Sequence, residues 1–222
     1  RSADNAGTIF IALRGTGQQS PLDWPNDLQS ALETLLQGVA VSQIVQMFNW
    51  WQRVGTPKGV DVAQFMVSPE FAAPIRTTDV KSTGEVAALL SATPGAKLVV
   101  TGSSLGGHLA MAFATLFPNQ LDQAVAFNAP GFGTQPGVAA LFQALGGSVP
   151  AVGNTLITNV LSSEARSGGN GVDLIAGFPD DNFPGLQLVV PIENQFQSDV
   201  VEPKVKSWNH DQRQVTDSLA VF

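Results

Sequence analysis

A serine inside a glycine-rich pentapeptide is the residue of this chain best suited to do chemistry. Ser104 is the central residue of Gly-Ser-Ser-Leu-Gly, residues 102–106, which matches the pattern Gly-x-Ser-x-Gly. An ordinary serine hydroxyl is a poor nucleophile at neutral pH, so an enzyme must expose it and place a base beside it. The two glycines have no Cβ, which allows the chain to turn sharply and present the hydroxyl. The pentapeptide therefore predicts a nucleophilic serine.

The sequence around Ser104 supplies the order of elements that such a turn requires. Residues 97–101 are an apolar run of strand length. After the pentapeptide, apolar residues recur at helical spacing from Leu105 to Leu116, and Pro118 predicts the end of that helix. Strand, turn and helix is the context in which this motif presents a nucleophile. The alternative is a glycine-rich turn that only joins a strand to a helix.

A nucleophilic serine needs a base, and the chain has two histidines. His108 lies four residues after Ser104, one turn into the predicted helix, so its side chain points along the helix and away from the hydroxyl. We interpret His108 as structural. His210 lies in a polar stretch before the last helical pattern, from where a loop can reach the serine. We predict His210 as the base, with a surface histidine as the alternative.

The acid that orients the imidazole is expected between the serine and the histidine in chain order. Asp173 is favoured because it follows a strand and a glycine-rich turn and precedes an apolar stretch that would shield it from water. Asp180 and Asp181 are its main rivals. Eight carboxylates lie in the interval: Asp122, Glu164, Asp173, Asp180, Asp181, Glu193, Asp199 and Glu202.

The negative charge that develops on the substrate oxygen needs fixed hydrogen-bond donors. One is predicted to be the backbone N–H of Leu105, at the start of the helix that follows Ser104. A second should come from the loop after an earlier strand, and Arg14-Gly15-Thr16 follows the first apolar run. Thr16 can offer both its backbone N–H and its hydroxyl. The alternative for this loop is a plain turn.

Short apolar strands alternate with helical patterns along the chain, which predicts an α/β fold with a mostly parallel sheet and helices on both faces. In such sheets the ligand site lies at the carboxyl ends of the strands. Strands are expected at residues 8–13, 97–101, 123–127, 155–161 and 186–191. Helices are expected at residues 23–35, 39–54, 86–91 (preceded by a capping box at 82–85, or starting near Thr78), 105–116, 137–145 and 212–222.

Composition narrows the class of protein. The 222 residues carry 44% hydrophobic and 13% charged residues, enough to bury one substantial core, so a single domain over residues 1–222 is expected, either a mature product or a domain excised from a longer chain. A net charge of −7 argues against nucleic acid as a partner. The absence of cysteine excludes disulfides and thiolate metal sites. With the two histidines about a hundred residues apart and no cysteine, a transition-metal site is not expected. No cofactor and no metal are predicted, and a structural calcium held by Asp180 and Asp181 is the alternative.

A series of short motifs, in order along most of the chain, resembles the class 3 (fungal-type) lipases of the α/β-hydrolase superfamily. The motifs are Arg14-Gly15-Thr16 with Trp24 and Asp27, Val-Thr-Gly-Ser-Ser-Leu-Gly-Gly at 100–107, Phe-Asn-Ala-Pro-Gly at 127–131, Asp173-Leu-Ile-Ala-Gly-Phe-Pro, and His210. The resemblance implies a triad of Ser104, Asp173 and His210, with Thr16 and Leu105 as the oxyanion hole. Ser103 stands where that family usually has histidine, but this side chain is not part of the triad. The closing residues 215–222 are similar to the helix after the catalytic histidine in bacterial secreted lipases and phospholipases, which implies secretion.

The leading hypothesis is a carboxylic-ester hydrolase that acts on lipid or other apolar acyl esters and touches a lipid interface transiently. Thioester or amide cleavage by the same residues is a second hypothesis, and a binding module that retains the hydrolase scaffold is a third. Residues 39–51 and 138–145 are candidates for a lid or an acyl pocket, with ordinary core helices as the alternative.

Overall fold

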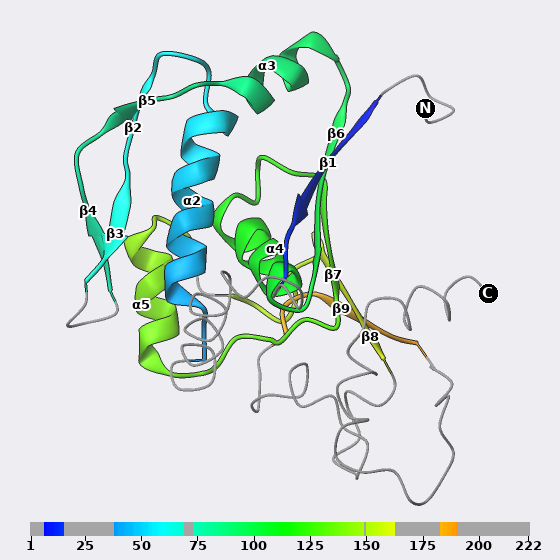
Figure 1. Cartoon of the computed structure of the whole chain (residues 1–222). Coiled ribbons are helices and arrows are strands. Elements are labelled where there is room, and N and C mark those ends of the chain that lie inside the picture. Colours follow the sequence, from blue (N-terminus) through cyan, green and yellow to red (C-terminus); the bar gives the residue numbers. More distant parts are fainter. Residues whose placement is uncertain (1–6, 16–37, 69–72, 149, 163–182, 191–222) are drawn as a thin grey trace, which may run out of the picture.

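A five-stranded parallel sheet forms the centre of the molecule (Figure 1). The computed structural model describes residues 7–15, 38–68, 73–148, 150–162 and 183–190. The sheet has the strand order β1-β6-β7-β8-β9, and each neighbouring pair is parallel. The strands are β1 (Thr8–Leu13), β6 (Lys97–Ser103), β7 (Gln123–Phe127), β8 (Ile157–Ser162) and β9 (Leu186–Val190). Each strand is added beside the last, so the chain crosses the sheet in one direction.

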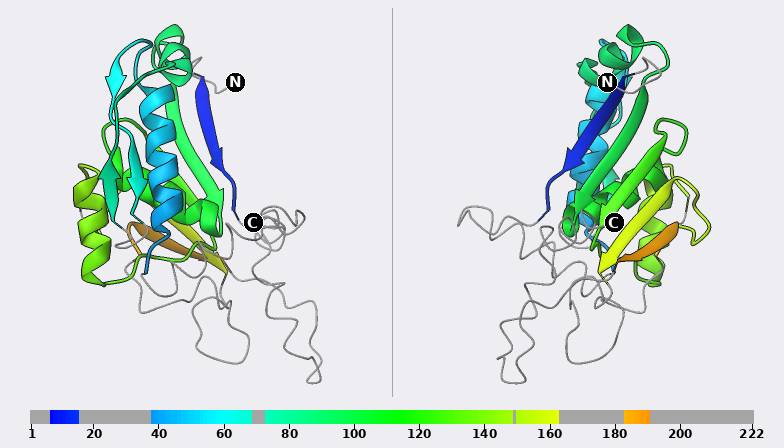
Figure 2. Two further views of the ribbon diagram at one scale, coloured as in Figure 1. Left: turned by 60° about the vertical axis from the view of Figure 1, so that its left-hand side comes forward. Right: turned by 90° about the vertical axis from the view of Figure 1, so that its right-hand side faces the viewer.

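Every helix in the described part of the chain lies on one side of this sheet (Figure 2). The helices are α2 (Val41–Gly55), α3 (Glu85–Ala92), α4 (Leu105–Leu116) and α5 (Pro136–Ala144). Crossovers between parallel strands are right-handed, so connections that all advance in the same direction must place their helices on the same face. None of these helices is long and apolar enough to span a bilayer.

Helix α4 is the central element of the core. All twelve of its residues are buried, because it lies against the sheet on one side and against α2 on the other. An aromatic cluster joins α4 to α2: the ring centroids of Trp51 and Phe113 lie 4.8 Å apart, and those of Phe48 and Phe117 lie 5.4 Å apart. The indole N–H of Trp51 donates to Oε1 of Gln120 at 2.7 Å, so the polar end of this side chain is also satisfied. This packing fixes the position of α4 relative to the rest of the fold.

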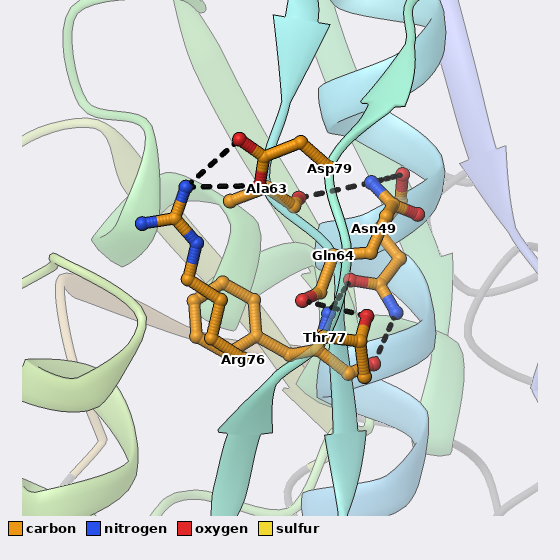
Figure 3. A network of polar contacts seen from close by, with 7 residues as sticks. Asn49, Ala63, Gln64, Arg76, Thr77 and Asp79 are labelled. Atoms are coloured by element: carbon orange, nitrogen blue, oxygen red, sulfur yellow. Dashed lines mark hydrogen bonds and ion pairs between the residues drawn. The ribbon is translucent and has the colours of Figure 1, made fainter.

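Two small antiparallel ribbons lie beside α2. They pair β2 (Asp61–Val62) with β5 (Val80–Lys81) and β3 (Phe65–Val67) with β4 (Pro74–Arg76). The side chain of Asn49 in α2 attaches the β3–β4 ribbon to the helix (Figure 3). It bonds to both backbone polar groups of one residue, as a neighbouring strand would. Its Nδ2 donates to the carbonyl of Phe65 at 2.6 Å, and its Oδ1 accepts from the backbone N–H of Phe65 at 2.8 Å.

Most of the expected elements in the described residues are confirmed, but two local predictions are wrong. The predicted capping box at 82–85 does not form: Gly84, at φ 76°, takes the cap position of α3, and the hydroxyl of Ser82 donates to the carbonyl of Pro57 at 2.5 Å. The alternative start of this helix near Thr78 is also wrong, because β5 occupies residues 80–81.

The two candidate lids are core helices. Helix α2 buries an apolar face that includes Ile44, Phe48 and Trp51, and α5 buries Val138, Leu141 and Phe142 in the same core. Residues 39–51 and 138–145 were candidates for a lid or an acyl pocket. The structure instead supports the other interpretation, that they belong to ordinary core helices. The predicted helix at 23–35 and the closing helical pattern at 212–222 lie outside the described residues.

Candidate active site

Ser104 forms the sharp turn between β6 and α4. Its backbone has φ 56° and ψ −127°, a left-handed conformation that non-glycine residues rarely adopt. Its N–H donates to the carbonyl of Phe127 in β7 at 2.9 Å, and its carbonyl accepts from the N–H of His108 at 3.0 Å. The residue is partly exposed rather than sealed in the core. The turn thus places Ser104 at the carboxyl end of β6 and at the start of α4, the context that the pentapeptide predicts.

The flanking glycines make room for this turn rather than supplying an unusual φ. Neither Gly102 nor Gly106 has a positive φ. A Cβ on Gly102 would lie 2.3 Å from the carbonyl group of Gly106, and a Cβ on Gly106 would lie 2.2 Å from the carbonyl oxygen of Leu13. The unusual dihedral angles fall on Ser104 itself, where such a conformation costs about 1–3 kcal/mol. The close approach of β6, α4 and the end of β1 is therefore what requires glycine at these positions.

The loop after β1 packs directly against the serine turn. A Cβ on Gly15 would lie 2.4 Å from the carbonyl oxygen of Ser103 and 3.6 Å from Cβ of Ser104. The strand register brings this loop there, because β1 and β6 run parallel and Leu13 pairs with Gly102. Thr16, the predicted oxyanion donor, lies outside the described residues, but its chain neighbour Gly15 is in contact with the turn.

Leu105 stands at the first position of α4, directly after Ser104. The first backbone N–H groups of a helix have no acceptor within the helix, and the helix dipole makes this end positive. Both effects favour an anionic oxygen beside Ser104, which is the role predicted for the N–H of Leu105. The structure therefore puts Leu105 at the start of α4, and its role as an oxyanion donor stays a prediction.

His108 is fully buried one turn into α4, as expected for a structural residue. The N–H of Ala40 donates to its Nε2 at 3.3 Å, so the proton is on Nδ1, which donates to the carbonyl of Pro130 at 3.1 Å. The ring also packs against Phe132, with centroids 4.6 Å apart. Burial lowers the pKa of His108 to about 4. This imidazole is neutral, and both its nitrogens are already used by the backbone.

One of the eight candidate acids is excluded by its place in the sheet. Asp122 accepts from the N–H of Leu98 at 2.7 Å, near the start of β6, whereas Ser104 follows the end of that strand. Six residues of strand separate the two positions by about 20 Å. The other seven candidates, which include Asp173, Asp180 and Asp181, lie outside the described residues, and so does His210. Among the residues that the structure describes, no three histidine or acidic side chains gather into a metal site.

Two asparagines near the site were not singled out from the sequence. Asn128, the residue after β7, is buried with φ 44°, and its N–H donates to the carbonyl of Val160 at 2.8 Å. Asn159 is buried within β8, and its Nδ2 lies 3.5 Å from the carbonyl of Ala129. An amide inside the apolar strand Ile-Thr-Asn-Val-Leu-Ser is the sequence signal that could have identified Asn159. Both asparagines hold the loop after β7 against β8. The next residue of this loop, Pro130, accepts the hydrogen bond from His108.

Comparison with known proteins relates the chain to lipases. Residues 10–167 match the family model for lipase (class 3). None of the curated proteins matches the chain. Among solved structures, the chain is similar to the Lip2 lipase from Yarrowia lipolytica, with 23% identity and a TM-score of 0.31 over 50% of this chain and 36% of that chain. It is also similar to a structure named FAE, with 12% identity and a TM-score of 0.38 over 98% of this chain and 79% of that one. The chain thus spans little more than a third of the Lip2 lipase, and at these identities and TM-scores neither structure informs its activity.

Proposed function

The chain belongs to the class 3 lipase family, and from that premise we propose that it is a serine hydrolase that cleaves the carboxylic esters of lipids or other apolar acyl compounds. The observation that carries the proposal is the conformation of Ser104. A strained, partly exposed serine between a central parallel strand and the N-terminus of a buried helix is the arrangement that activates a nucleophile in α/β-hydrolases. Strain of this kind persists where function requires it.

The base in this proposal follows by elimination. The chain has two histidines, and His108 is buried with both ring nitrogens bound to backbone groups. We therefore assign His210 as the base and keep Asp173 as the acid that orients it. Asp180 and Asp181 are the alternatives to Asp173.

The reaction proceeds in two steps. The hydroxyl oxygen of Ser104 attacks the acyl carbon while His210 takes the hydroxyl proton, and the carbonyl oxygen becomes an oxyanion bound by the N–H of Leu105 and by Thr16. The tetrahedral intermediate collapses, the alcohol leaves with the proton from His210, and the acyl group stays on Ser104. Water then attacks the acyl-serine with His210 again as base, which releases the acid and restores the serine.

The first test is the nucleophile. Ser104→Ala should abolish hydrolysis of p-nitrophenyl esters of short and medium chains and abolish labelling by a fluorophosphonate probe, while circular dichroism stays unchanged. Ser103→Ala is the matched control, because it removes a hydroxyl from the neighbouring residue of the same turn, and it should keep both activities. Hydrolysis or labelling that survives in Ser104→Ala would remove the basis of the proposal.

The second test assigns the acid and the base. His210→Gln should lower kcat by a factor of about a thousand or more, while the protein remains folded. Among Asp173→Asn, Asp180→Asn and Asp181→Asn, the first should show a comparable loss. Asp122→Asn is the control for removal of a carboxylate, because this residue lies at the opposite end of β6. A full loss in Asp180→Asn or Asp181→Asn, with activity kept in Asp173→Asn, would reassign the acid.

The same scaffold could serve a thioesterase or peptidase, or a non-catalytic binding module, and experiments distinguish these functions from ester cleavage. Matched ester, thioester and anilide substrates with the same acyl group compare ester cleavage with thioesterase or peptidase activity, and the proposal expects the ester to have the highest kcat/KM. A non-catalytic binding module would bind acyl compounds without fluorophosphonate labelling of Ser104.

A further inference from the structure

The backbone of Ser104 is held at both of its polar groups. Its N–H donates to the carbonyl of Phe127, the last residue of β7, at 2.9 Å, and its carbonyl accepts from the N–H of His108 in α4 at 3.0 Å. One partner therefore belongs to the sheet and the other to the helix. The dihedral angles of Ser104, and with them the position of its hydroxyl, depend on how the first turn of α4 lies relative to the end of β7.

The first turn of α4 lies close to the loop after β7, residues 128–131. A Cβ on Gly107 would lie 2.7 Å from Cβ of Ala129. Glycine allows this close approach, but it has no side chain that could form a directional contact with the loop. The next residue of the helix is His108, and its Nδ1 donates to the carbonyl of Pro130 at 3.1 Å. The imidazole therefore supplies a directional bond between this turn and the loop.

The bond from His108 to Pro130 completes a closed series of contacts around the serine turn. The series runs from the carbonyl of Ser104 to the N–H of His108, and then through the imidazole to Pro130. The chain leads back from Pro130 to Phe127, whose carbonyl accepts the N–H of Ser104. Nε2 of the same imidazole accepts from the N–H of Ala40 at 3.3 Å, so the residue before α2 is attached as well. An apolar side chain of similar size would fill the space but would leave both backbone groups without this partner.

We propose that His108 is a positioning residue for Ser104: its bond to Pro130 fixes the start of α4 against the loop after β7 and thereby sets the position of the nucleophilic hydroxyl. The effect on turnover rests on the proposed function. A displacement of about 1 Å at a reacting atom can cost up to about a hundredfold in rate, so loss of this bond should lower kcat. KM should change little, because the imidazole is fully buried.

Two amide variants separate the two bonds of the imidazole. The Nδ2 of an asparagine lies about where Nδ1 of histidine lies, so His108→Asn can still donate to Pro130 but cannot reach Ala40. The Oε1 of a glutamine lies about where Nε2 lies, so His108→Gln can still accept from Ala40 but cannot donate to Pro130. We expect kcat for p-nitrophenyl esters to fall at least about tenfold in His108→Gln, with KM within about twofold of the wild type. In His108→Asn, kcat should fall less than about threefold.

A control variant separates positioning from a general loss of stability. Asn49→Ala removes two hydrogen bonds between α2 and Phe65, so it should destabilise the protein while kcat matches that of the wild type. Two kinetic results would overturn the proposal. A wild-type kcat in folded His108→Gln would show that the bond to Pro130 does not position the nucleophile. Equal falls of kcat in His108→Gln and His108→Asn would show that this bond is not the one that matters.

Amide hydrogen exchange tests the geometry without any turnover. In His108→Gln, the exchange rate of the Ser104 N–H should rise at least about tenfold more than that of the Phe117 N–H. Phe117 is the reference because it lies at the other end of α4, where its N–H donates to the carbonyl of Phe113 at 2.8 Å. A general loss of stability would raise both rates by the same factor, and that result would overturn the proposal. Selective exchange at Ser104 in a chain that neither hydrolyses esters nor reacts with a fluorophosphonate would support the hold on Ser104 and refute the proposed function.

Discussion

Replacing the buried imidazole of His108 should change how the stability of the protein depends on pH. Burial lowers the pKa of His108 from its ordinary value of 6.5 to about 4. Between these two values the unfolded chain binds a proton that the folded protein excludes, so the free energy of unfolding falls as the pH falls. The stability due to the neutral imidazole is fully present above pH 6.5 and is lost progressively down to about pH 4. At about 1.4 kcal/mol per pKa unit, the shift corresponds to a total of about 3 kcal/mol.

The assay is urea unfolding of the wild type and of His108→Gln at a series of pH values from about 7 to 4.5. Carboxylates titrate in both proteins, so the informative quantity is the difference between the two curves. The wild type should lose about 2 kcal/mol more than the variant over this interval, because glutamine does not titrate. His210→Gln is the matched control, because it removes the other histidine and keeps His108, so it should retain the loss of stability that protonation of His108 causes. Equal losses in wild type and His108→Gln would refute the reasoning and mean that His108 is protonated at little cost.

Three further pairs of variants test backbone conformation and packing in the fold. Gly106→Ala should lower the free energy of unfolding by about 3 kcal/mol in chemical denaturation, because the new Cβ would lie 2.2 Å from the backbone oxygen of Leu13. Gly137→Ala is the control. Its Cβ would have no atom within 4 Å, so it should raise the free energy of unfolding by about 0.5–1 kcal/mol. Ser104→Gly should be about 1 kcal/mol more stable than the equally inactive Ser104→Ala in thermal unfolding, because glycine accepts the positive φ without strain. Asn49→Ala should cost about 1–3 kcal/mol, because it breaks both bonds to the β3–β4 ribbon, whereas loss of the exposed ion pair in Arg76→Ala should change the unfolding midpoint little.

Strands β1, β6 and β7 of the main sheet could be predicted because each contains a continuous apolar run. Residues 8–13 and 123–127 coincide with β1 and β7, and the predicted run at 97–101 is β6 without its last two residues. The ribbons between residues 61 and 81 were missed because strands of two or three residues show no periodicity. The capping box failed for a tertiary reason, since Ser82 bonds instead to Pro57, twenty-five residues away.

The candidate site divides in the same way. Ser104 could be predicted because its signal is local, a pentapeptide between a strand and a helix. The reason why residue 106 must be glycine could not be read fully from the sequence. A Cβ there would collide with the carbonyl oxygen of Leu13, which lies in a strand more than ninety residues earlier. Asp122 could be excluded only from the sheet, where its bond to Leu98 places it at the far end of β6. The constraint on residue 106 and the position of Asp122 both depend on contacts between segments far apart in the sequence. A local sequence pattern carries no information about such contacts.

Separate roles for the two histidines imply two different effects of acid on this protein. His108 bridges Ala40 and Pro130 one turn after Ser104, so its neutral form helps to hold α4 and therefore the strained serine turn. Protonation of the proposed base, His210, would slow turnover while the fold stays intact, because a protonated imidazole cannot accept the hydroxyl proton of Ser104. Protonation of His108 requires a pH near 4 and acts on the fold itself. Activity that is lost while His108 is still neutral should therefore recover on return to neutral pH, whereas acidification to about pH 4 should also weaken the fold.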